Sequence, residues 1–269
     1  MSELRPARRS RGPVLHGVWG ADPALIGGRF GVGDRIGGYV VSSRLGSGRY
    51  GVCFLAEDPS GRQVVLKRFR RRMLKRNAGR NHYEAVILSG LSHPAVPQLL
   101  GVVNDRTGYW FVLELQPGRS LKSWLFDRHR EFTRREIVGI GVRLFDVVTY
   151  LHGRNVVHGD ISIANVLYDD GMVSLIDFGL ARYIGSRVGE VPADEIGLDH
   201  ARLADVLLYL MYSCAGLSRG NRRAAWYDDL WLTASQRDCV KRLMGFGTPY
   251  ADTASAAEDF RRAFADWLR

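Results

Sequence analysis

The chain has 269 residues, of which 46% are hydrophobic, and a formal net charge of +10. This length fits one large domain or two modest lobes, and the composition is ordinary for a globular protein with a sizeable core. The three cysteines, Cys53, Cys214 and Cys239, lie far apart and follow no CxxC spacing, which argues against a disulfide framework or a zinc site.

Two basic segments account for much of the charge. Residues 1–35 are rich in Gly, Arg and Pro and predict a flexible basic arm, and residues 67–80 form a second, dense run. Such charge indicates either solvated surface or an acidic partner for the arm and the run. Aromatic residues do not alternate with the basic ones, so we expect no specific nucleic-acid binding.

The apolar segments are short. The longest, about residues 204–217, cannot span a bilayer, and no apolar region follows Arg8 and Arg9 near the N-terminus. We therefore expect a cytoplasmic protein without a signal peptide or a membrane span.

From Tyr39 onward, the pattern predicts secondary structure in two blocks that meet near Pro117 and Gly118. The first block has β-branched strands with one helix between them, and the second is mainly helical. The expected fold is therefore α+β. The expected strands are 39–45, 52–58, 63–69, 96–105 and 108–115, and the expected helices are 77–91, 121–129, 135–155 and several from about Asp199 onward.

A glycine-rich turn joins the first two expected strands. Gly46, Gly48 and Gly51 permit positive φ angles and let backbone N–H groups approach an anion closely. A dinucleotide-binding turn would open a helix, whereas a strand follows here, and the Lys-Ser/Thr of a P-loop is missing.

Lys67 and Glu84 are the next candidates. Lys67 ends the apolar run VVLK, so it either points from a buried sheet face into a cavity or reaches solvent along its stem. Glu84 is the only acid between Asp58 and Asp105, on the helix after the basic run. It is either a surface ion pair or a buried partner for Lys67.

Three further oxygen-bearing side chains stand in the second block. Asp160 and Asn165 lie in the loop HGDISIAN, and Asp177 ends an apolar strand before a glycine in LIDFG. One carboxylate and one amide oxygen suit Mg²⁺, a hard cation that keeps waters and binds substrate phosphates. Asp160 would then remain free to accept a proton from an incoming hydroxyl.

Taken in this order, the five motifs resemble those of protein kinases, in the eukaryotic-like (Hanks-type) serine/threonine form found in bacteria. The resemblance covers about residues 38–269. It implies a two-lobed protein-kinase-like fold, with a small antiparallel sheet plus one helix in an N-lobe, 36–118, and a mainly helical C-lobe, 119–269. It also implies ATP and Mg²⁺ as ligands and a protein as the substrate.

The resemblance further implies a role for each matching residue. Asp160 orients the substrate hydroxyl and accepts its proton, while Lys67 contacts the α- and β-phosphates and pairs with Glu84. Asp199 braces the catalytic loop. The remaining implied contacts are Asn165 and Asp177 to Mg²⁺, Gly46, Gly48 and Gly51 over the phosphates, Glu114 and Leu115 in the hinge, and Val52 and Leu167 around the adenine ring.

The chain also departs from the family pattern. Gly159 stands where these kinases carry an arginine that reads a phosphate on the activation segment. The only hydroxyls between Asp177 and Asp199 belong to Tyr183 and Ser186. These departures lead to the hypothesis that activity does not depend on phosphorylation of this segment.

Ser162 replaces the lysine that contacts the transferred phosphate in serine/threonine kinases. This keeps two alternatives open: a small-molecule phosphotransferase of the aminoglycoside or choline kinase type, and an inactive pseudokinase scaffold. Residues 226–231, WYDDLW, would either line an acceptor pocket or pack the C-lobe, and burial of large aromatic side chains favours packing. Phe260, Phe264 and Trp267 recur at helical spacing and predict core positions.

Overall fold

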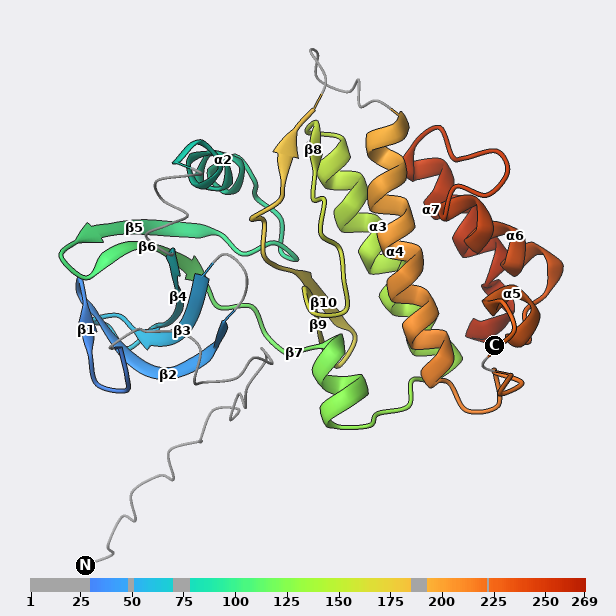
Figure 1. The fold of residues 1–269 in the computed structure, drawn as a ribbon, viewed down its shortest axis with the longest axis horizontal. Coiled ribbons are helices and arrows are strands. Elements are labelled where there is room, and N and C mark those ends of the chain that lie inside the picture. The colour runs from blue at the N-terminus through green and yellow to red at the C-terminus, as the bar shows by residue number, and fades with distance from the viewer. Residues whose placement is uncertain (1–29, 48–50, 70–77, 185–192, 222) are drawn as a thin grey trace, which may run out of the picture.

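The computed structural model describes residues 30–47, 51–69, 78–184, 193–221 and 223–269, and it has two lobes (Figure 1). The smaller lobe is an antiparallel sheet in the order β1-β2-β3-β4-β6-β5 with helix α2 beside it. Its elements are β1 (Arg35–Ile36), β2 (Tyr39–Ser47), β3 (Gly51–Glu57), β4 (Gln63–Phe69), α2 (Ala78–Ser89), β5 (Leu99–Asp105) and β6 (Gly108–Glu114).

The two faces of this sheet bury different sets of side chains. Phe54, Leu66 and Trp110 lie on one face, in a cluster of the smaller lobe. The other face carries Lys67, and also Phe111, which packs with Ile87 and Leu88 of α2. Because side chains alternate along a strand, β4, β5 and β6 contribute to both clusters.

Residues 30–35 differ from the sequence expectation of a flexible arm. The ring of Phe30 packs edge-on against Trp110, with the centroids 5.3 Å apart. Arg35 pairs with Val40 in the sheet, and the backbone N–H of Val41 donates to the carbonyl of Asp34 at 2.9 Å. The folded lobe therefore includes these residues, while 1–29 and 70–77, which hold most of the two basic segments, lie outside the described residues.

The larger lobe is mainly helical, as Figure 1 shows. Its first long helix begins with a capping box, in which the Thr133 side chain and Glu136 satisfy each other's backbone N–H groups. The expected helix over 121–129 is instead a short π-helix, and the helix expected from Asp199 begins earlier, at Ala193. The helices are η2 (Ser123–Asp127), α3 (Arg134–His152), α4 (Ala193–Ser213), α5 (Trp226–Asp229), α6 (Ala234–Leu243), α7 (Thr253–Ala263) and η3 (Ala265–Leu268).

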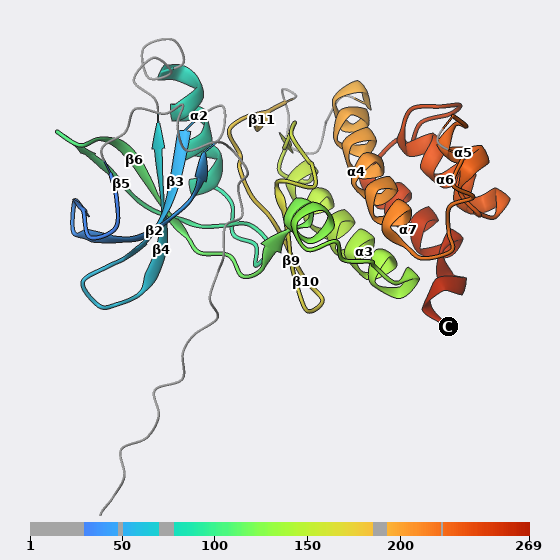
Figure 2. The same ribbon diagram turned by 60° about the horizontal axis from the view of Figure 1, so that its bottom comes forward.

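Short strands run along the side of the larger lobe that faces the sheet (Figure 2). They are β7 (Arg119–Ser120), β8 (Val156–Val157), β9 (Val166–Asp169), β10 (Met172–Leu175) and β11 (Arg182–Tyr183). The loop after β8 carries Asp160 and Asn165, and the loop after β10 carries Asp177. These strands therefore fix the two loops on which the sequence placed its candidate residues.

The core prediction for the last aromatic residues is confirmed, since Phe260, Phe264 and Trp267 are all buried. Their rings pack in series, with centroids 4.8 and 4.9 Å apart. Within the described ranges, no helix combines the length and the apolarity that crossing a membrane requires.

Candidate active site

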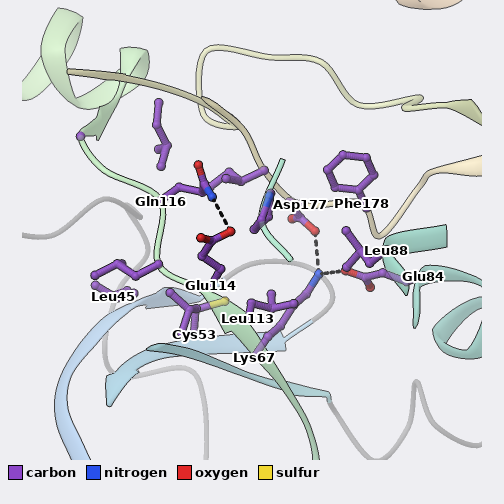
Figure 3. Close-up of a pocket in the computed structure, with 16 residues that line it drawn as sticks. Leu45, Cys53, Lys67, Glu84, Leu88, Leu113, Glu114, Gln116, Asp177 and Phe178 are labelled. Atoms are coloured by element: carbon purple, nitrogen blue, oxygen red, sulfur yellow. Dashed lines mark hydrogen bonds and ion pairs between the residues drawn. The ribbon is translucent and has the colours of Figure 1, made fainter. Parts of the chain in front are cut away.

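A cavity of about 740 Å³, including its open mouth, lies between the sheet and the short strands of the larger lobe (Figure 3). Apolar side chains line most of it, and Lys67, Glu84 and Asp177 stand together in its wall. Its size and its few convergent polar groups are those of a small-molecule site. The apolar lining residues are Leu45, Cys53, Val65, Leu88, Pro97, Leu113, Leu115, Leu167, Ile176 and Phe178.

Lys67 lies between two carboxylates. Its Nζ is 2.6 Å from Glu84 Oε1 and 2.8 Å from Asp177 Oδ1, as the dashed lines of Figure 3 show. Burial opposes the charged form, but the carboxylates of Asp177 and Glu84 raise the pKa of Lys67 above its usual range. The structure thus shows Lys67 and Glu84 as a buried ion pair and not as a pair on the surface.

Asp177 is held in an uncommon backbone conformation. Its φ is +65°, in the left-handed region. Burial would raise the pKa of its carboxyl group, but the ammonium of Lys67 outweighs this, and the pKa lies below the ordinary value. The next residue, Phe178, is buried against the ring of His158, with the centroids 4.7 Å apart. Asp177 is therefore an ionised carboxylate at a fixed position.

Asp160 and Asn165 contact each other directly. The Nδ2 of Asn165 donates to the backbone carbonyl of Asp160 at 2.9 Å and to its Oδ2 at 3.0 Å. Because both hydrogen bonds use the amide nitrogen, the oxygen of Asn165 is left to act as a ligand. Partial burial raises the pKa of Asp160 above its ordinary value.

Asp199 braces the loop that carries Asp160. Its carboxylate accepts the backbone N–H groups of His158 and Gly159, each at 2.8 Å, and lies 3.1 Å from Nε2 of His152. Burial would raise the pKa of Asp199, but the hydrogen bond from His152 and the nearby histidines keep it below its ordinary value. This is the position that the resemblance implied for Asp199.

The brace continues through a buried hydrogen-bonded chain to the start of α7. Nδ1 of His152 is 2.7 Å from the Thr253 hydroxyl, which is 2.9 Å from Nε2 of His200. A hydroxyl can donate one hydrogen bond and accept another, so Thr253 bridges the two imidazole rings. The chain thus ties Asp199 to α7 through buried side chains.

The structure turns Val52 away from the cavity, contrary to its expected place beside an adenine ring. Val52 lies in the cluster with Trp110, on the other face of the sheet. Cys53 pairs directly opposite Lys67 and lines the cavity in its place. Burial raises the pKa of the Cys53 thiol to about 12, so it acts as a small neutral side chain.

The other predicted nucleotide contacts divide into two groups. Glu114, Leu115 and Leu167 line the cavity. Gly46, the residue before the last of β2, pairs with Cys53, and Gly51 begins β3. Gly48 lies outside the described residues.

The segment 226–231 shows contacts within the lobe. Asp229 is buried and accepts the hydroxyl of Ser218 at 2.7 Å and the backbone N–H of Asn221 at 2.8 Å. Trp226 packs against the main core. These contacts are those of a packed loop, in line with the interpretation that the sequence favoured.

Residues 39–196 match the protein kinase domain. The chain is 30% identical over 229 residues to the probable serine/threonine-protein kinase YbdM of Bacillus subtilis, covering 84% of this chain and 89% of that one. It is 32% identical to the serine/threonine-protein kinase PLK4 of Aedes aegypti, over 55% of this chain and 20% of that one. It is 31% identical to a calcium/calmodulin-dependent protein kinase type 1 of Macrobrachium nipponense, over 54% of this chain and 43% of that one.

The chain belongs to the protein kinase family. The expected two-lobed α+β kinase fold is therefore confirmed.

Sequence reasoning missed several residues that line the cavity of this kinase, among them Leu45, Cys53 and Gln116. The signal for Cys53 is its place two residues after Gly51, where the family's motif G-x-G-x-x-G-x-V carries its valine. Gln116 lies just past the hinge strand, and its side chain contacts Ser174 Oγ at 2.9 Å and Glu114 Oε2 at 3.2 Å. Ser174 is distant in sequence, and Gln116 itself lies outside the recognised motifs, so no local pattern signals Gln116.

Proposed function

We propose that this kinase transfers the γ-phosphoryl group of ATP to a serine or threonine hydroxyl of a protein, with Lys67, Glu84, Asp160, Asn165 and Asp177 as its working residues. The observation that carries the proposal is Lys67 Nζ held between Glu84 and Asp177 at 2.6 and 2.8 Å. Both the lysine–glutamate ion pair and a placed metal-binding aspartate are required for kinase activity.

The adenine ring would enter the apolar part of the cavity, between Leu167 and Cys53. The backbone of the hinge, Glu114 and Leu115, would meet its polar edge. The glycine turn, Gly46, Gly48 and Gly51, would cover the phosphates with backbone N–H groups. Lys67 would contact the α- and β-phosphates, since its charge faces the cavity and Glu84 fixes its direction.

Asn165 and Asp177 fit a magnesium ion. They offer one amide oxygen and one ionised carboxylate, hard ligands of the kind Mg²⁺ takes when substrate phosphates and water complete its shell. Among the described residues, no group of three or more His, Cys, Asp or Glu side chains forms a metal cluster, so an all-protein cage is not the alternative there. Held by Asn165 and Asp177, the ion would neutralise the negative charge that develops on the phosphates during transfer.

Asp160 would orient the acceptor hydroxyl and take its proton. Asn165 holds one of its carboxylate oxygens, and Asp199 holds the backbone N–H groups of His158 and Gly159, the two residues before Asp160. Burial raises the pKa of Asp160, which brings its basicity closer to that required of a general base near neutral pH. Catalysis would come mainly from positioning and charge stabilisation.

The test is transfer from γ-labelled ATP with Mg²⁺, comparing the wild type with Asp160→Asn. The assay contains the protein alone, a generic protein acceptor and a panel of small cationic alcohols. We expect label on serine or threonine of protein, with turnover reduced by about 10²–10⁴ in the variant, the range that a positioned proton acceptor contributes.

Other outcomes would overturn parts of the proposal. Label only on a small alcohol would identify a small-molecule phosphotransferase. ATP binding without any transfer, with the whole acceptor set, would identify a pseudokinase. Equal turnover by Asp160→Asn and the wild type would remove Asp160 from its role.

A further inference from the structure

Because Gly159 has no side chain, the side chain of Arg182 can lie beside the catalytic loop. The φ of Gly159 is +75°, and a Cβ on it would lie 3.0 Å from the carbonyl oxygen of Leu180 and 3.1 Å from Nη1 of Arg182. The guanidinium of Arg182 therefore occupies the space where a side chain on residue 159 would begin. An arginine at 159, as the family carries, would have to displace it.

Arg182 is fixed there by the backbone of the activation segment. In β11 it pairs with Val157 of β8, just before the catalytic loop. The N–H of Ile184 donates to the carbonyl of Asn155 at 2.9 Å. The strand β11 lies between α2 and α4 in both views (Figures 1 and 2). The place of Arg182 thus follows from strand pairing.

The head of Arg182 forms an ion pair with Glu195 in α4. Glu195 is one helical turn before Asp199, the residue that holds the N–H groups of His158 and Gly159. The ion pair therefore joins the start of the activation segment to the helix that braces the catalytic loop. The Glu195 carboxylate therefore pairs with Arg182 as a phosphate on the activation segment would pair with an arginine.

The other side of β11 contacts α2, the helix that carries Glu84. The hydroxyl of Tyr183 lies 3.3 Å from the point where a Cβ on Gly90 would be. A shift of β11 would therefore disturb both the end of α2 and the catalytic loop.

We propose that Arg182 and Glu195 are positioning residues that hold the activation segment in its working arrangement, with the Glu195 carboxylate in place of a phosphate. This inference rests on the proposed function. The side chains of the pair are 41% and 30% exposed, so the pair adds little to folding stability. Its effect must then appear in turnover while the unfolding temperature stays the same.

The test compares the phosphatase-treated wild type with Arg182→Ala, Glu195→Gln and the exchanged pair Arg182→Glu/Glu195→Arg. The control is Arg261→Ala, which breaks a similarly exposed ion pair between α7 and α3, Arg261 to Asp146 at 2.7 Å. Intact mass confirms that no phosphate remains. The kcat, the KM for ATP and the unfolding temperature are measured for each protein with the acceptor identified for the wild type.

We expect the dephosphorylated wild type and Arg261→Ala to keep their kcat. Each single variant should lose about fivefold in kcat, the factor that corresponds to about 1 kcal/mol for an exposed pair. The KM for ATP and the unfolding temperature should stay unchanged, and the exchanged pair should recover part of the loss.

Single variants with wild-type kcat would overturn the inference and leave the proposed function intact. So would loss of activity on dephosphorylation, or a fall in kcat matched by a lower unfolding temperature. A wild type without turnover would overturn the proposed function and, with it, this inference.

Discussion

Replacing Thr253 by valine tests the hydrogen-bonded chain behind the catalytic loop. The change keeps the shape of the side chain and removes only the hydroxyl. That hydroxyl is 2.7 Å from Nδ1 of His152 and 2.9 Å from Nε2 of His200, and all three side chains are buried. Two buried nitrogens would lose their partner in one step.

Each unsatisfied buried group costs about 1–3 kcal/mol, so Thr253→Val should lower the free energy of unfolding by about 2–6 kcal/mol. Turnover should fall too, because His152 links Thr253 to Asp199, and Asp199 holds the backbone beside Asp160. Thr253→Ser keeps the hydroxyl and gives up one methyl group, for about 1 kcal/mol.

Urea unfolding and kcat measured on the two variants decide the matter. A valine variant as stable as the serine variant, with the same kcat, would show that the chain neither stabilises the fold nor positions the loop. A stability loss without any change in kcat would confine the chain to a structural role.

Three further predictions follow from the same geometry. Asp177→Asn should abolish Mg²⁺-dependent turnover with an unchanged circular dichroism spectrum, and undiminished turnover would refute the metal role. Cys53→Val should keep the KM for ATP near its wild-type value, because the thiol is neutral and small. Cys53→Trp should place a large ring in the cavity and raise the KM for ATP. Equal KM values for the two variants would show that the adenine ring binds elsewhere. Burial and the adjacent His152 hold the pKa of His200 at about 4, so the folded protein keeps it neutral where the unfolded chain protonates it near 6.5. Its contribution to stability should be complete above about pH 6.5 and decline by up to about 3 kcal/mol toward pH 4, and urea unfolding should show a flatter pH profile for His200→Gln; identical profiles would contradict the assigned pKa.

Much of the site was predictable because its motifs are local. Asp160 and Asn165 lie five residues apart in one loop, and Asp177 precedes a glycine. This spacing is enough to predict the three candidate residues and the family. The strands and the long helices follow from alternation and from helical spacing, each of which acts over a few residues.

Two sequence predictions were wrong about which side chains meet in the folded protein. Val52 and Cys53 differ by one step along a strand, and one step reverses the face. The pairing of β3 with β4 places Cys53 opposite Lys67, and the motif G-x-G-x-x-G-x-V, counted from Gly46, also ends at residue 53 and not at residue 52. Phe30 likewise packs on Trp110, far along the chain, so composition alone assigned its segment to the arm.

By itself, the sequence determined the family, the two-lobed fold and the candidate catalytic residues, since each of these depends on residue types at short spacings. The tertiary structure decided the rest. It showed that Lys67 is buried between Glu84 and Asp177, and that Arg182 lies against Gly159. Such contacts join positions far apart in the chain, or depend on the path of the backbone in space, and neither a local period nor a motif encodes them.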